Sequence, residues 1–554
     1  MNKLISVFFL LLLLLSINST FGQKKQYNNP IIPGFNPDPS ICKVGDDYYL
    51  ATSSFEYFPG VPIYHSTDLV NWQMVGHALR RPEQLDLESI PSTAGIYAPT
   101  LRYHDGTYYM ITTLITEGQE RPNKPAGNFV VTAKNPAGPW SNPIWIESAP
   151  GIDPSLFFDD DGKVYYCGNS PPEIPNDKPE RQVIWIQEIA LPSFKLIGKK
   201  SYLESKKYHE QDIIGSPMAF EAPHIYKKEG IYYLLIAHGG TGMGHAVSIW
   251  KSKSPFGPWE DNPDNPILTH RGYSESGINC TGHADVFQIE DGSWWSVLLA
   301  VRSDDKKNNV MGRETFLAPV DWSGTWPIFN PKGTVGRITF THDAPSMMTN
   351  QKNNTDFEDT FDQKKLNLAW TMIRTPETTW WDLETDPGNV SIKLRPDQIE
   401  QFAQPSFLGI RAPDMKMKAT TTLNFDPKQP NECAGLAFER GHDAEWTLIK
   451  EQLDNKLVVS VYQDGKELLG QVLLQTNNTI SLKIELINFK MTFSVKESDT
   501  SWQTVAEAQT KELLGFPKAG RFTGSFVGLY ASSRGKKSNN KAVFENFSLA
   551  KLTK

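Results

Sequence analysis

Phe35-Asn36-Pro37-Asp38-Pro39-Ser40-Ile41 is the stretch around which the chain is organised. Its Asp-Pro-Ser returns as Asp153-Pro154-Ser155, and Glu221-Ala222-Pro223-His224 is a related stretch with Glu in place of Asp. If the three stretches open successive repeats arranged around a centre, their carboxylates gather at one end of a common axis. The repetition therefore predicts both an architecture and an active site.

A second pattern marks the same repeats. A turn of Gly and an acidic residue precedes a pair of aromatic residues five times, in 45–49, 105–109, 161–166, 229–233 and 291–295. Gly and Asp tolerate the positive φ of tight hairpin turns, so each copy indicates two antiparallel strands. The units open at Asp38, Ala98, Asp153, Glu221 and His283, about 60 residues apart, a spacing that suits a four-stranded blade. Most units then run through a further apolar segment that ends in Trp, although the third unit lacks this Trp.

Five such sheets predict a five-bladed β-propeller, because a single blade is too thin to bury both of its faces. The opening motif precedes the first aromatic hairpin, so we expect it on the innermost strand, with its side chains facing the axis. The fold prediction is therefore all-β, with the propeller at residues 27–340.

Composition agrees with a large β-protein. The chain has 554 residues, of which 39% are hydrophobic, with 40 Gly and 39 Pro, which indicates at least two globular domains. A net charge of -8 without a basic stripe argues against nucleic acid as a partner.

The first 22 residues are typical of a signal peptide. Lys3 is followed by an apolar run from Ile5 to Leu15 and by small residues that favour cleavage after Gly22. The run is shorter than the roughly 20 residues that span a bilayer, and no Cys follows it to carry a lipid. We expect an exported protein, periplasmic or secreted, with no membrane attachment after cleavage.

The four cysteines are far apart and form no C-x-x-C pair, so we expect buried apolar side chains rather than disulfides or a zinc site. They are Cys42, Cys167, Cys280 and Cys433.

After about residue 340 the repeat stops. We expect a linker at 341–355 and a second domain at 356–554, a concanavalin-like jelly-roll β-sandwich built of short alternating strands. Its predicted strands include 390–394, 420–424, 435–439, 457–461, 480–484 and 526–530. Aromatic residues 357, 361 and 370 open this domain, and Phe544 and Phe547 lie in its closing strand.

Three carboxylates on one axis suit glycoside hydrolysis. That reaction needs a protonated carboxyl that gives a proton to the leaving oxygen and an ionised carboxylate that activates water or attacks the sugar. A third, nearby charge raises the pKa of the acid and keeps it protonated near neutral pH. The alternative is that each Asp-Pro-Ser is only a turn motif.

The motifs together resemble those of family 43 glycoside hydrolases, in the branch of β-xylosidases and α-L-arabinofuranosidases that carry a C-terminal β-sandwich. The stretches are 36–41, 151–156, 220–224, 281–285 and 312–315, in the same order as in the family. The resemblance implies that Asp38 is the general base, Glu221 the general acid, and Asp153 the residue that tunes and orients the acid. It also implies inversion at the anomeric carbon, with about 6.5–9.5 Å between acid and base.

The resemblance implies further substrate-binding positions. Phe55 and Tyr97 match aromatics that wall the terminal sugar, although many relatives carry Trp where this chain has Tyr97. Arg313 matches a substrate-binding arginine, with an ion pair to Glu314 or another acid as the alternative.

Two other positions lie near the expected centre. His283 matches a histidine near the channel centre, with a buried core histidine as the alternative, and Thr241 matches a position at the site rim. His224, His238 and His245 lack the spacing of a transition-metal site. No cofactor is required, and a structural calcium ion is left open.

The sandwich domain has two readings. Trp380 and Trp381 could stack on glycan or could be core residues. In xylosidase-like relatives this domain pushes an aromatic toward the active-site rim, and Phe522 is our candidate. Such a contact shortens the pocket and favours removal of terminal sugars.

The functional prediction is an exo-acting inverting glycosidase that releases terminal α-L-arabinofuranosyl residues from hemicellulose side chains of arabinoxylan or xyloglucan type, with β-xylosidase activity beside it. A β-D-xylosidase acting on xylo-oligosaccharides is the alternative, and a non-catalytic glycan-binding propeller is a third reading. The partner is an oligosaccharide or polysaccharide, and the oligomeric state is left open.

Overall fold

The computed structural model describes residues 25–118, 124–170, 182–203, 219–304, 308–352, 355–476, 479–498, 500–514 and 522–552. The predicted signal peptide therefore lies outside the described residues. Within them, no helix is long and apolar enough to cross a membrane.

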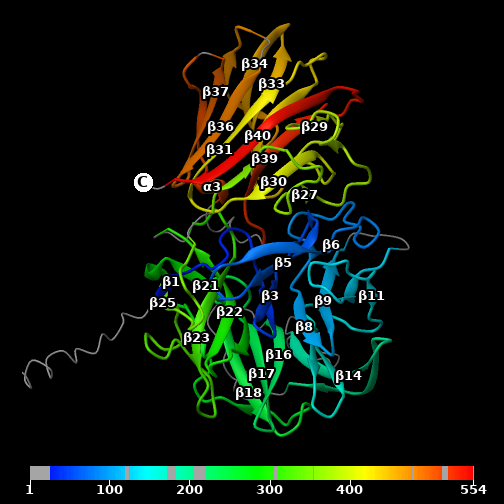
Figure 1. Ribbon diagram of the computed structural model, residues 1–554, viewed down its shortest axis with the longest axis vertical. Coiled ribbons are helices and arrows are strands. Elements are labelled where there is room, and N and C mark those ends of the chain that lie inside the picture. Colours follow the sequence, from blue (N-terminus) through cyan, green and yellow to red (C-terminus); the bar gives the residue numbers. More distant parts are fainter. Residues whose placement is uncertain are drawn as a thin grey trace, which may run out of the picture.

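Figure 1 shows two stacked β-domains, with the N-terminal half of the chain below and the C-terminal half above. The lower domain contains five antiparallel sheets, each with a path of four strands. The first sheet is β2 (Ser40–Val44), β3 (Asp47–Ala51), β5 (Gly60–Ser66) and β6 (Gln73–Leu79). The second is β7 (Gly95–Ile96), β8 (Thr100–His104), β9 (Thr107–Ile115), β10 (Gly127–Ala133) and β11 (Ile144–Trp145), and the third is β12 (Ser155–Phe158), β13 (Val164–Ser170), β14 (Val183–Ala190) and β15 (Lys195–Tyr202). The fourth is β16 (Phe220–Lys228), β17 (Ile231–His238), β18 (Ala246–Ser252), β19 (Glu260–Asp261) and β20 (Leu268–Thr269), and the fifth, which follows the 3₁₀ turn η1 (Ser274–Ser276), is β21 (Ile278–Gln288), β22 (Trp294–Arg302), β23 (Glu314–Asp321) and β24 (Ile328–Phe329).

The first strands of the five sheets adjoin one another in a closed ring. β2 contacts β8 and β21, and β12 contacts β8 and β16, which in turn contacts β21. This is the arrangement of a five-bladed propeller, and it confirms the predicted architecture. Near the closure, β1 (Gln26–Asn28) pairs with β25 (Thr341–Asp343), so the first three residues of the predicted linker form a strand on the propeller side.

The turns behave as their residues predict. Asp105 and Gly106, between β8 and β9, have φ of 48° and 71°, and Glu229 and Gly230, between β16 and β17, have φ of 52° and 78°. Positive φ at both central residues matches the right-handed twist of hairpin strands. The aromatic residues that follow these turns pack between neighbouring blades, as with Tyr49 and Tyr108, whose rings lie 5.4 Å apart.

The upper domain is a sandwich of two antiparallel sheets. One contains β26 (Phe357–Asp359), β28 (Trp381–Asp382), β29 (Val390–Lys393), β40 (Lys541–Lys551), β31 (Lys416–Asn424), β36 (Ile480–Ile487), β37 (Lys490–Glu497) and β38 (Gln503–Gln509). The other contains β30 (Ser406–Arg411), β39 (Phe526–Ser532), β32 (Cys433–Glu439), β33 (Glu445–Leu453), β34 (Lys456–Gln463) and β35 (Glu467–Leu473). The helix α3 (Lys511–Leu514) follows β38. Trp370, Phe544 and Phe547 are buried between the sheets, as expected for residues that open and close the domain.

The two domains are joined by backbone pairing. β4 (Tyr57–Phe58) of the propeller pairs with β27 (Met372–Ile373) of the sandwich. Gly524 lies so close to the propeller that an added Cβ would approach the Met311 carbonyl oxygen to 2.0 Å. This close approach places the segment that begins at Phe522 directly over the propeller.

The four cysteines form no disulfide with one another, as expected. Cys42, Cys167 and Cys433 are buried, whereas Cys280 is partly exposed, so the expected burial is wrong for Cys280.

Candidate active site

The three repeated acids lie at the inner ends of blades one, three and four. Asp38 and Asp153 each stand two residues before their inner strand, with φ of 55° and 53°, whereas Glu221 lies within β16. The expectation that all opening residues lie on the inner strand is therefore wrong for these two Asp residues. The left-handed φ turns the chain sharply as it enters the blade, and Asp tolerates this conformation better than most residues.

Asp38 is held by partners on both carboxylate oxygens. Arg313 Nη1 donates to Oδ1 at 2.6 Å, and Ser53 Oγ donates to Oδ2 at 2.6 Å. His283 Nδ1 lies 3.6 Å from Oδ1, and burial lowers the pKa of this imidazole. Because Asp38 is only 3% exposed, these donors take the place of water around its carboxylate.

Glu221 and Asp153 form an electrostatic pair. Burial and, to a smaller extent, the Asp38 carboxylate raise the pKa of Glu221 to about 7, although the Arg313 charge acts in the opposite direction. Burial also raises the pKa of Asp153 well above its usual range, and the charges of Glu221 and Asp38 add to this. Because the pKa values of both Glu221 and Asp153 are raised by burial and by neighbouring carboxylate charge, this pair retains a proton near neutral pH.

The two members of this pair differ in their partners. Asp153 Oδ2 accepts a hydrogen bond from the Ala222 backbone N–H at 3.2 Å, which ties blade three to blade four. Among the described residues, the Glu221 carboxyl has no such partner, and this side chain is partly exposed while Asp153 is 7% exposed. Glu221 is therefore the carboxyl that is free to contact a bound molecule.

Arg313 connects the acids to the sandwich domain. Besides Asp38, its Nη1 donates to Thr241 Oγ1 at 3.2 Å, and its Nε and Nη2 donate to the Phe522 carbonyl oxygen at 3.3 and 3.2 Å. Glu314, the alternative partner considered for Arg313, pairs with Arg302 instead. The guanidinium is thus fixed from both domains.

Three aromatic rings form one wall beside Arg313. The ring of Phe55 lies 5.0 Å from Tyr97 and 6.0 Å from Phe522, and Tyr97 lies 5.9 Å from Phe522. The Arg313 guanidinium carbon stands 5.4 Å from the centre of the Phe55 ring. The Tyr97 hydroxyl hydrogen-bonds to the Thr93 carbonyl oxygen and to Glu117, both at 3.2 Å.

The structure thus brings together all nine residues selected from the sequence. They are Asp38, Phe55, Tyr97, Asp153, Glu221, Thr241, His283, Arg313 and Phe522. The contacts above link them, except for Glu221, which the charges of Asp38 and Arg313 affect.

Sequence reasoning missed a buried polar network beneath these residues. Asp285 accepts from Arg102 at 2.8 Å, from Ser40 Oγ at 2.8 Å and from the Tyr226 hydroxyl at 2.8 Å. Arg102 Nη2 also contacts His224 Nδ1 at 3.0 Å. The network joins four blades directly behind the acids. The only signal for it in the sequence was the Asp that follows His283 by two positions.

The structure offers little for a metal. No group of three or more His, Cys, Asp or Glu side chains in the described ranges is arranged to hold a metal ion. Asp285, whose charge acts on His224, is already paired with Arg102. Calcium also takes backbone carbonyl oxygens and water as ligands, so the structural calcium ion that the sequence left open remains untested.

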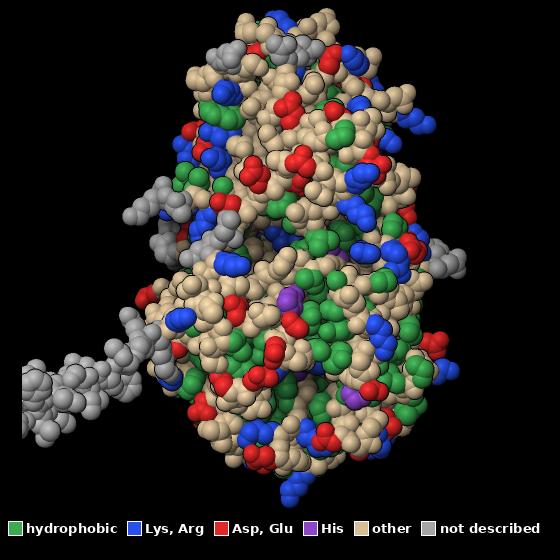
Figure 2. Space-filling model, viewed as in Figure 1, with side chains coloured by type: hydrophobic (Ala, Val, Ile, Leu, Met, Phe, Trp, Pro, Cys, Tyr) green, Lys and Arg blue, Asp and Glu red, His purple; other side chains and the backbone are tan. Residues whose placement is uncertain are grey.

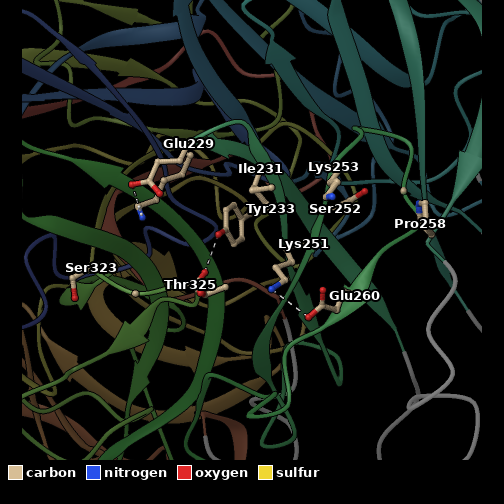
Figure 3. A pocket seen from close by; sticks show the side chains of 13 residues that line it. Glu229, Ile231, Tyr233, Lys251, Ser252, Lys253, Pro258, Glu260, Ser323 and Thr325 are labelled. Carbon is tan, nitrogen blue, oxygen red and sulfur yellow. Dashed lines mark hydrogen bonds and ion pairs between the residues drawn. The ribbon is translucent and has the colours of Figure 1, made fainter.

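The pocket in Figure 3 is a different feature. It has a volume of about 650 Å³ and is lined by Glu229, Tyr233, Lys251 and Thr325 among others, with Lys251 paired to Glu260. The lining includes Lys228 at the end of the inner strand β16, together with parts of β17, β18 and β19 and nearby turns, and none of the nine site residues lines it. Within the lining, the Tyr233 hydroxyl also donates to the Thr325 carbonyl oxygen, and the pocket contains none of the three repeated acids.

The two candidate tryptophans of the sandwich behave differently. Trp380 is 1% exposed and belongs to the core, whereas the Trp381 side chain is partly exposed. The stacking reading is therefore wrong for Trp380.

Comparisons with known proteins agree with this geometry. Residues 27–327 match the model of glycosyl hydrolases family 43, and residues 358–550 match the β-xylosidase C-terminal concanavalin A-like domain. A non-reducing end α-L-arabinofuranosidase of Bacteroides ovatus is 38% identical over 97% of this chain and 98% of its own length. A xylosidase/arabinosidase of Butyrivibrio fibrisolvens is 40% identical over 95% of this chain and 99% of its own length.

Solved structures give the same result. The family 43 protein from a xyloglucan locus of Bacteroides ovatus superposes with a TM-score of 0.85 at 37% identity, covering 95% of this chain and all of that one. A xylan β-1,4-xylosidase from Bacillus halodurans superposes with a TM-score of 0.86 at 32% identity, with the same coverage. The resemblance inferred from the motifs is thereby confirmed, and the chain belongs to family 43 of the glycoside hydrolases.

Proposed function

We propose that the protein is an exo-acting, inverting α-L-arabinofuranosidase that removes terminal arabinofuranosyl residues from hemicellulose side chains and has β-xylosidase activity beside it. The observation that carries the proposal is that one acid of the site has hydrogen-bond partners on both oxygens while another has none. Asp38 is fixed by Arg313 and Ser53, whereas the Glu221 carboxyl has no hydrogen-bond partner among the described residues and a pKa raised to about 7.

Each acid then has a role in one displacement. Asp38 accepts a proton from a water molecule whose oxygen attacks the anomeric carbon. The bond from that carbon to the leaving oxygen breaks, and Glu221 gives its proton to the leaving oxygen. Burial and the Asp38 carboxylate keep Glu221 protonated. Asp153, which accepts a hydrogen bond from the N–H of the next residue, Ala222, has the role of orienting Glu221.

Exo action is supported by the aromatic wall. Phe522 comes from the sandwich and closes the wall formed by Phe55 and Tyr97, with its carbonyl oxygen bound to Arg313. A pocket closed on this side accepts the end of a glycan rather than its middle. Arabinofuranose is favoured because the Bacteroides ovatus relative is named for that activity. Xylose is the alternative because other relatives that match most of this chain are named xylosidases.

Turnover of two nitrophenyl substrates tests the proposal. We expect the α-L-arabinofuranoside to be hydrolysed with a higher kcat/KM than the β-D-xyloside. A higher kcat/KM for the xyloside would favour the β-D-xylosidase reading. Hydrolysis of neither, by folded protein, would contradict the proposal and favour a glycan-binding propeller.

We also propose that the protein is exported, on the basis of the N-terminal 22 residues. Sequencing the N-terminus of protein from the source cells tests this. A mature chain that begins near Gln23 is expected, and a chain that retains the apolar run would contradict export by cleavage.

A further inference from the structure

A groove lies between the two domains, beside the β4–β27 pairing. Its volume is about 510 Å³, within the range of about 300–1,000 Å³ that is typical of ligand sites. Figure 2 shows Lys and Arg side chains together with apolar ones at the waist between the domains. The residues on which the inference rests are His77, Arg80, Lys364, Lys365, Glu377 and Trp381.

Trp381 gives the groove a fixed aromatic surface. It is partly exposed, and its ring meets the edge of the buried Trp380 at 5.1 Å and an angle of 81°. Because Trp380 is 1% exposed and packed in the core, it restricts the rotation of its neighbour. A ring held in this way presents an apolar face at little cost in conformational entropy.

His77 gives the groove a polar atom without a partner. The residue is 2% exposed, it lines the groove, and its Nε2 makes no hydrogen bond within the described chain. Burial lowers the pKa of this imidazole to about 3, so the ring is neutral at physiological pH. A buried polar atom without a partner is costly, and a ligand hydroxyl in the groove would remove that cost.

The exposed charges around the groove are mostly positive. Arg80, Lys364 and Lys365 are exposed, and none of them forms an ion pair within the part of the chain that the structure describes. Glu377 is the acid that faces them from the same lining. Three free cations against one acid favour an anionic ligand over a neutral one.

We propose that this groove binds an acidic oligosaccharide, a short glycan that includes a uronic acid. One sugar ring stacks on Trp381, a hydroxyl bonds to His77 Nε2, and the carboxylate lies among Arg80, Lys364 and Lys365. The inference rests on the proposed function in one respect, because it takes the ligand to be a glycan.

The groove is close to the aromatic wall along the chain. Phe58 lines the groove and Phe55 belongs to the aromatic wall, so their Cα atoms are at most about 11 Å apart. Binding of a charged branch in the groove would therefore keep the enzyme on the polymer from which it removes terminal sugars, by raising the local concentration of chain ends.

Calorimetric titration of the Glu221→Gln protein tests the inference. The probes are xylotetraose that carries one glucuronic acid branch and unbranched xylotetraose. We expect the acidic probe to bind at least about tenfold more tightly, with an affinity that falls as salt rises. Lys364→Gln combined with Lys365→Gln should remove this preference, and Trp381→Ala should weaken binding of the acidic probe about tenfold.

Equal affinity for the two probes would overturn the inference. Unchanged binding of the acidic probe in both groove variants would also overturn it, because the probe would then bind only at the active site. The double lysine variant changes only exposed side chains, so its result stands even if Trp381→Ala unfolds the sandwich. Hydrolysis of the nitrophenyl arabinofuranoside by the unaltered enzyme reports on the proposed function separately.

Discussion

Arg313 offers the sharpest test of how charge is arranged in the site, through two substitutions that separate its charge from its shape. Arg313→Gln removes the positive charge, whereas Arg313→Lys keeps a charge but cannot reach Asp38 and the Phe522 carbonyl oxygen together. Both contacts exist in the native site, at 2.6 Å and at 3.2–3.3 Å.

The magnitudes follow from these contacts. Loss of one buried donor of this kind typically lowers kcat about 100- to 1,000-fold, and we expect a loss of that order in both variants. The pH dependence should differ between them. Glu221 must be protonated to act as the acid, so kcat/KM of the native enzyme falls as pH rises through about 7. The Arg313 charge lowers the pKa of Glu221, so its removal in Arg313→Gln should move this fall upward by about one pH unit. Arg313→Lys should leave the fall near its native position.

The assay is the pH profile of kcat/KM on a nitrophenyl arabinofuranoside, with melting temperatures of both variants as the control for folding. Removing one partner of a buried pair costs about 3–5 kcal/mol of stability, which makes this control necessary. Equal pH profiles for the two folded variants would refute the assignment of the acid limb to Glu221 under the influence of Arg313.

Three further outcomes are expected. Tyr97→Phe removes the hydroxyl that hydrogen-bonds to Glu117, so KM should rise about fivefold with kcat nearly unchanged. An unchanged KM would mean that the neighbouring rings alone orient the side chain of residue 97. Gly524→Ala should destabilise the protein by about 1–3 kcal/mol in chemical denaturation, because the new methyl group meets backbone across the domain interface. Gly324→Ala is the control, because a methyl group at Gly324 meets open space. Equal stabilities of the two variants would contradict the close packing of the domains. Glu445 is 0% exposed, and burial raises its pKa from 4.5 to about 9, so this carboxyl lowers the stability of the fold progressively as pH rises between those values. Glu445→Gln should therefore raise the melting temperature more at pH 8 than at pH 5. The opposite order would contradict the burial of an unpaired carboxyl.

The features that could be predicted from the sequence are those set by neighbouring residues. The acidic–Gly turns before paired aromatics predicted the five sheets, because turn φ and strand alternation depend on local sequence. The three acids were found through motifs at the unit openings, and the other six site residues through the resemblance to family 43. The left-handed φ of Asp38 and Asp153 was missed, because an Asp-Pro dipeptide also fits the extended start of a strand.

Features that join distant segments could not be predicted. The network of Asp285 with Arg102 and Tyr226 connects residues from three blades, and no local pattern specifies which charged groups will meet. Trp380 and Trp381 are adjacent in the sequence, and only the packing of the sandwich determines that one is buried while the other faces the interdomain groove.

The central claim is that Asp38 acts as the base and Glu221 as the acid, and hydrolysis rates of the Asp38→Asn and Glu221→Gln variants test it most directly. The substrates are two aryl arabinofuranosides, one with a good and one with a poor leaving group. Asp38→Asn should lose at least about 1,000-fold in kcat on both, because water activation is needed whatever leaves. Glu221→Gln should lose activity mainly on the poor leaving group, which needs the proton. Retention of native kcat by Asp38→Asn, or equal losses on both substrates for Glu221→Gln, would contradict the account.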